Sequence, residues 1–156
     1  MFYNGVLGIH SLLRWALIIL LVINISRSFF HNNKPYSTTD RSWNLRLIIA
    51  THINLVIGLY AYFFGPKGYM LIKTFGFGEV MKSAQMRFWA VEHFTGMIIA
   101  IVLITITSSI SKAALKSDTA KHKKLFWLYF LALITIIATV PWPFRFSEIP
   151  WFRGLY

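Results

Sequence analysis

The sequence contains no cysteine. Disulfides, thiolate metal sites, iron–sulfur clusters and covalently attached c-type haem are therefore excluded. Acidic residues are scarce, with five Asp and Glu against 16 Lys and Arg, and charged residues make up only 13% of the chain. Soluble domains carry roughly 25% charged residues. Since the usual signatures of a nucleophilic or two-carboxylate enzyme are also missing, we expect a membrane protein and not a soluble enzyme.

The residues that are present are strongly apolar: 56% of them are hydrophobic. They gather in runs of roughly 20 residues, the length that crosses a bilayer as a helix. These runs predict an all-α membrane protein, with one transmembrane domain over residues 1–156 and helices at about 6–25, 42–64, 87–110 and 123–140. The connection at 67–85 is the longest, and it has apolar clusters at 70–72 and 80–81 that suit a short interfacial helix.

The distribution of basic residues predicts how the helices are oriented, because cytoplasmic loops carry an excess of Lys and Arg. One side of the membrane would carry nine, namely Arg27, Lys34, Arg41, Arg46, Lys112, Lys116, Lys121, Lys123 and Lys124, against six on the other, namely Lys67, Lys73, Lys82, Arg87, Arg145 and Arg153. This predicts an up-down-up-down bundle with both termini on the non-cytoplasmic side. The same rule accounts for the net charge of +11, so the expected partner is the lipid bilayer and not nucleic acid. His31 and His122 lie in these basic segments and are expected to be solvated.

Ionisable side chains inside the predicted helices are the main functional signal, because they persist in hydrocarbon mostly where they face a partner, a cofactor or water. The first helix carries His10 and Arg14 one turn apart, the second carries His52, and the third carries Glu92 and His93. At about 1.5 Å per residue, His10 and His93 lie roughly 8–10 Å below the same surface, whereas His52 lies near ~18 Å. His10 and His93 are therefore level on parallel helices.

Two level histidines that face each other across a bundle suit the axial ligation of a b-type haem, which needs no cysteine. Gly58 lies level with His93, and Gly96 lies one turn deeper on the same face. Both are expected to make room for the macrocycle. Arg87 and Arg145 are expected to hold the haem propionates near the surface.

A buried ion pair is expected between Arg14 and Glu92, whose depths agree within about a turn. Pairing would lower the desolvation cost of both groups, and it would orient His93 or His10. Two other interpretations of these residues stay open. One is a purely structural polar network between the helices, and the other is a proton, ion or quinone pathway.

His52 has no level histidine partner in this arrangement. It could bind a second, five-coordinate haem, bond a quinone, or relay protons with Thr51 and Asn54. It could also replace His10 as the partner of His93. A three-histidine site for copper or zinc requires the helices to slide from this register.

Four segments of the chain carry a family resemblance: HSLLRW at 10–15, HINLVIG at 52–58, RFWAVEH at 87–93 and PWPFR at 141–145. Together they resemble short four-helix bacterial membrane proteins described as cytochrome b-like, and the resemblance covers nearly the whole chain. It implies a bundle with intramembrane histidines, haem b, and residence in the bacterial inner membrane. The residues it carries over are His10, His52 and His93, with Arg14 and Glu92 beside them.

The leading functional hypothesis is an integral membrane b-type haem electron carrier or cytochrome subunit. It would exchange electrons with quinol or a partner protein, and it would be an electron-transfer subunit and not a stand-alone enzyme. The alternative is a non-catalytic accessory subunit of a larger membrane complex, with a polar network in place of haem. A small transporter or proton conductor ranks last, because no inverted repeat or broken helix supports it.

Overall fold

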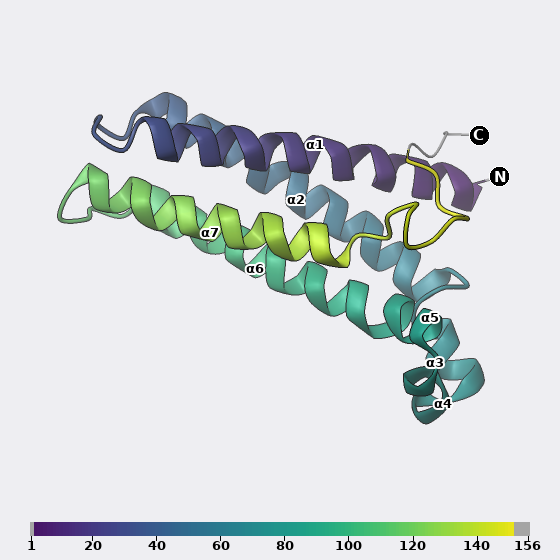
Figure 1. Ribbon diagram of the computed structural model, residues 1–156. Helices are drawn as coiled ribbons and strands as arrows, with labels where there is room; N and C mark the ends of the chain where they lie inside the picture. Colours follow the sequence, from purple (N-terminus) through teal and green to yellow (C-terminus); the bar gives the residue numbers. More distant parts are fainter. Residues whose placement is uncertain (1, 152–156) are drawn as a thin grey trace.

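The computed structural model of the chain describes residues 2–151, and every regular element among them is helical (Figure 1). Four helical segments are long and apolar enough to cross a membrane, which confirms the prediction of an all-α chain with four helices that can span a bilayer. The long helices are α1 (Phe2–Phe30), α2 (Thr38–Phe64), α6 (His93–Lys112) and α7 (Asp118–Thr139). Between α2 and α6 lie α3 (Tyr69–Phe75), α4 (Phe77–Lys82), α5 (Ala84–Arg87) and a π-helical turn, η1 (Phe88–Glu92).

Local capping explains why two helices begin earlier than predicted. Ser37 precedes α2, accepts a hydrogen bond from the backbone of Asp40, and receives the carboxylate of Asp40 on its own N–H. This reciprocal pair is a capping box, and it moves the start of α2 from residue 42 to Thr38. Ser117 accepts a bond from the backbone of Ala120 in the same way and begins α7 at Asp118.

The four long helices form a bundle in which α1 packs on α2 and α7, and α6 packs on the same two helices, so α1 and α6 are diagonal. The α1–α2 and α6–α7 connections lie together at one end, which we call the turn end (Figure 1). The N-terminal residues, helices α3–α5 and the C-terminal segment 140–151 lie at the other end, which we call the cavity end. Toward it, α1 and α6 diverge (Figure 1).

The hydrophobic core runs along the bundle from the turn end to the floor of the cavity end, where Ile136 and Val140 belong to it. Its fully buried members come from all four long helices and include Leu21, Leu47, Ile104 and Leu125. Large apolar side chains also cover the outside of the helices, as expected where the surrounding solvent is lipid. A set of polar side chains is buried between the helices. The amide of Asn44, for example, accepts hydrogen bonds from the hydroxyls of Thr107 (2.7 Å) and Tyr129 (2.9 Å).

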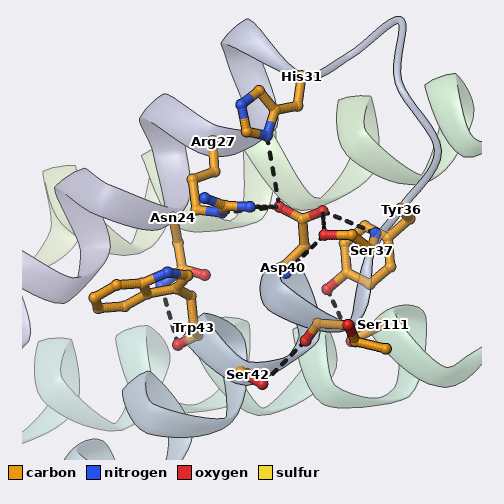
Figure 2. Close-up of polar contacts among 10 residues, drawn as sticks. Asn24, Arg27, His31, Tyr36, Ser37, Asp40, Ser42, Trp43 and Ser111 are labelled. Carbon is orange, nitrogen blue, oxygen red and sulfur yellow. Dashed lines mark hydrogen bonds and ion pairs between the residues drawn. The ribbon is translucent and has the colours of Figure 1, made fainter.

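At the turn end, an ion pair joins α1 to α2 (Figure 2). Arg27 of α1 lies 2.7 Å from a carboxylate oxygen of Asp40, which is only 5% exposed, and His31 lies 3.8 Å from the same oxygen. The expectation that His122 is solvated is wrong. Its side chain is 1% exposed, and its ring lies 5.3 Å from that of Tyr36.

Candidate functional site

A cavity of about 510 Å³ lies inside the cavity end of the bundle. Ligand sites usually enclose about 300–1,000 Å³. Its walls come from α1, α2, the η1–α6 segment and the C-terminal segment. A second, mainly apolar cavity of about 80 Å³ lies between α2 and α6 and shares His10, Asn54, Gly58 and His93 with the first. The two histidines that were predicted to be level therefore line the same space.

His93 is fixed by the end of α7. Its Nδ1 lies 2.7 Å from the carbonyl oxygen of Thr139, and because a carbonyl only accepts, Nδ1 carries the proton. Helix continuation would have offered this carbonyl the N–H of residue 143, but Pro143 has none. The bond leaves Nε2 of His93 without a proton, so the lone pair of that nitrogen is available. This is the usual state of a histidine that coordinates a metal.

The π-helical turn decides which side chain enters the cavity. The N–H of His93 bonds to the carbonyl of Phe88, five residues earlier, so η1 contains one residue more than an α-helical turn. One extra residue rotates the remainder of the helix by about 100°. His93 consequently faces the cavity, while Glu92 lies with the arginines outside it. Such π-turns often occur at functional sites.

His10 lies against the backbone of α2. A Cβ atom on Gly58 would come within 3.1 Å of Cε1 of His10, so the absence of a side chain at residue 58 gives the ring its place. Asn54, one turn before Gly58, is close enough to interact with His10. Nevertheless, neither Nδ1 of His10 nor Oδ1 of Asn54 makes a hydrogen bond of good geometry.

Unpaired polar atoms converge on this cavity. Among the described residues, the buried side-chain atoms without a hydrogen-bond partner belong to five residues, and four of these line the cavity: His10, Arg14, Asn54 and Trp89. Buried polar groups are nearly always hydrogen-bonded. Their concentration around one space makes this cavity the candidate binding site.

The predicted pair of Arg14 and Glu92 is wrong. Glu92 instead lies 2.7 Å from Nε of Arg87 and 3.4 Å from a terminal nitrogen of Arg145. Arg14 donates to the hydroxyl of Ser11 (3.3 Å) and to the carbonyl oxygen of Trp151 (2.8 Å). Arg14 lines the cavity, whereas neither Arg87 nor Arg145 is among its lining residues.

Two other predicted site residues lie away from the cavity. His52 is exposed on the surface of α2, where its Nδ1 bonds to the carbonyl of Ile48 at 2.8 Å. Gly96 is buried against α7, and a side chain there would collide with Thr139. Gly96 therefore allows close packing of α6 on α7 and does not make room for a ligand. The part of the chain that the structure describes contains no group of three metal-binding side chains, so the three-histidine site does not form.

A scan against protein-family models, a search of curated proteins and a search of solved structures each found no match. The function must therefore be inferred from the chemistry of the site.

Three contributors to the site were not among the predicted site residues. Trp89 and Lys67 line the cavity, and the carbonyl of Thr139 orients His93. A signal for Thr139 exists in the sequence, because Pro143 leaves the carbonyl four residues earlier without its helical donor. Lys67 lies three residues after the end of α2, which contributes Ala61 and Tyr62 to the cavity wall, so its proximity to the site could have been expected. No pattern identifies Trp89, because its direction depends on the π-turn.

Proposed function

We propose that this protein is an integral membrane b-type haem electron carrier, with His10 and His93 as the axial ligands. The observation that carries the proposal is the hydrogen bond from Nδ1 of His93 to Thr139, which leaves Nε2 unprotonated in a residue that lines a cavity together with His10. The two histidines come from the diagonal helices α1 and α6, so they would hold the iron from two sides of the cavity. When bound, haem supplies a one-electron iron couple.

The chain's own residues fit this role. Thr139 holds the ring of His93, and Asn54 is the corresponding neighbour of His10, with an unused amide oxygen. An Nδ1–H bond to that oxygen would leave Nε2 of His10 for the metal, which is the same arrangement as at His93. Gly58 keeps the ring of His10 against α2. The mainly apolar walls exclude water and favour a flat hydrophobic ligand.

The membrane context completes the proposal. The helices would cross the bacterial inner membrane in an up-down-up-down course with both termini on the non-cytoplasmic side, in line with the basic residues near the turn end. The site would then lie near the non-cytoplasmic surface. Electrons would pass to or from quinol or a partner protein.

Absorption spectroscopy of the purified protein, oxidised and reduced, tests the assignment. We expect a Soret band and sharp bands on reduction, which indicate two strong axial ligands. His10→Ala and His93→Ala should each lose haem or turn high-spin. His52→Ala is the matched control and should keep the wild-type spectrum, since His52 is exposed away from the cavity. A colourless protein after haem supplementation, or a spectrum that depends on His52 and not on His10, would defeat the proposal.

A quinone in place of haem is the second candidate, and the apolar cavity between α2 and α6 favours it. Leu55, Leu59, Ile98 and Ile101 are among the residues that line that cavity, which could accommodate part of an isoprenoid tail. The quinone ring would accept a hydrogen bond from Arg14, which lines the larger of the two cavities. Solvent extraction followed by chromatography distinguishes the two candidates, because a stoichiometric quinone without haem supports the second.

A further inference from the structure

The cavity contains two cations and one acid. Arg14 and Lys67 are the only Lys or Arg side chains among its described lining residues, and Glu148 is the only acid. Glu148 lies 3.6 Å from Nζ of Lys67, and both side chains are more than 40% exposed, so this pair is weak and displaceable. No acid within the described residues pairs with Arg14.

Arg14 is the stronger signal of the two cations. It belongs to a membrane-spanning helix, where an unpaired charge is costly and usually marks a ligand or a pathway. Its hydrogen-bond acceptors, Ser11 and the carbonyl of Trp151, are neutral. Its Nε is buried and has no partner. A guanidinium with a free Nε–H presents part of the fork that binds carboxylates bidentately.

Trp89 supplies another unused donor. Its indole Nε1–H is buried without a partner, and indole nitrogen can only donate. Nζ of Lys67 lies 4.4 Å from the centre of the indole ring, so the second cation of the cavity is held beside this donor. The indole N–H of Trp89 and the ammonium group of Lys67 therefore suit a hydrogen-bond acceptor. The positive charge of Lys67 favours an acceptor that is anionic.

We propose that Arg14, Trp89 and Lys67 bind the carboxylates of the ligand, which in the proposed haem site are the propionates. This inference rests on the proposed function and assigns the anionic groups of the ligand to α1, η1 and the connection between α2 and α3. Arg87 and Arg145, the cations expected from sequence, are already paired with Glu92. A lipid headgroup phosphate would offer the same anionic chemistry, so the test must separate the two sources.

Haem-depleted protein in detergent is titrated with haem b and with the dimethyl ester of haem b, which differ only in their propionates. The comparison distinguishes binding of the propionates from binding of a lipid phosphate at these residues. The wild type should bind the ester more weakly by roughly tenfold to hundredfold, since hydrogen bonds to charged groups are lost. Arg14→Gln and Trp89→Phe should each reduce the ratio of the two dissociation constants, ester over haem, by about tenfold. Arg14→Lys should recover part of it, because the charge remains but the fork is lost. Arg87→Gln is the control and should leave the ratio unchanged.

The outcomes are distinct. Wild-type protein that binds neither porphyrin defeats both the haem assignment and this inference. Tight and equal binding of haem and its ester upholds the haem site but overturns the assignment of propionates, and it favours a lipid anion at Arg14. If Arg14→Gln does not fold, Trp89→Phe and Arg14→Lys still test the inference. A ratio of ester to haem dissociation constants that equals the wild-type ratio in both of these variants would overturn it.

Discussion

Nδ1 of His93 lies 2.7 Å from the carbonyl oxygen of Thr139, and this hydrogen bond ties the start of α6 to the last residue of α7. Gly96, one turn further along α6, lies against the side chain of the same threonine. The orientation of the proposed ligand histidine and the close packing of α6 on α7 at Gly96 therefore depend on one residue of α7.

Gly96→Ala should consequently damage both stability and the site. The added methyl collides with Thr139 and forces α6 from α7, which costs about 1–3 kcal/mol of unfolding free energy. Moving α6 away from α7 also lengthens the hydrogen bond between His93 and Thr139, so the amount of bound cofactor should decrease. Thermal unfolding in detergent and cofactor content measure the two effects. Gly78→Ala is the matched control, because nothing lies within 4 Å of its added Cβ, and stability equal to wild type in Gly96→Ala would contradict the packing.

Asp40→Asn should destabilise the turn end. It removes a buried carboxylate that pairs with Arg27 and caps α2, and loss of one partner of a buried ion pair costs about 3–5 kcal/mol. Because Arg27 is 24% exposed and gains water, we expect the lower part of this range. Unfolding by denaturing detergent measures the change. Glu79→Gln is the control, since that carboxylate is 63% exposed and its pair with Lys82 should contribute less than about 1 kcal/mol.

Asn44→Ala tests the polar network inside the bundle. The change removes the acceptor of two buried hydroxyls, those of Thr107 and Tyr129. Hydrogen bonds between membrane helices average about 0.6 kcal/mol each, so we expect a loss of about 1–2 kcal/mol. A double-mutant cycle with Tyr129→Phe should give a coupling energy of about 0.5–1 kcal/mol. Strictly additive effects would show that the bond between these residues contributes nothing.

Glu92→Gln should have little effect, although the sequence alone suggested a buried partner for Arg14. Glu92 is 34% exposed, and its partners Arg87 and Arg145 are 36% and 45% exposed, so solvent screens both pairs. We expect a loss of about 0–1 kcal/mol in unfolding free energy and an unchanged cofactor content. A marked loss of bound cofactor in this variant would restore a direct role for Glu92 in the site.

Axial position along the helices could be predicted from sequence, but rotation about them could not. The regular helical rise made His10 and His93 level, and the structure has both lining one cavity. By contrast, the face of Glu92 was predicted wrongly. The π-turn before His93 shifts the angular register by about 100°, and no hydrophobic periodicity marks its extra residue. Gly96 shares a side of α6 with His93, since both contact Thr139, but at Gly96 that side packs on α7 and leaves no room for a ligand.

The start of α2 is a local feature. Ser37 and Asp40 have the spacing of a capping box, in which Asp40 returns its carboxylate to the backbone of Ser37. The exposure of single residues depends on tertiary context instead. His52 sits among polar neighbours in sequence but is exposed on α2, since its position on the helix turns it away from the bundle. This exposure does not follow from residue type alone.

The carbonyl of Thr139 and the C-terminal segment 140–151 are the last parts of the site to be synthesised, and this sets the order in which the site can be assembled. A chain emerging from the ribosome inserts α1, α2 and α6 before the residue that orients His93 has been synthesised. Loading of the proposed haem would therefore follow the docking of α7, and the apoprotein would be a stage of maturation. A chain shortened to end before residue 139 should insert in the membrane and remain colourless, whatever the supply of haem.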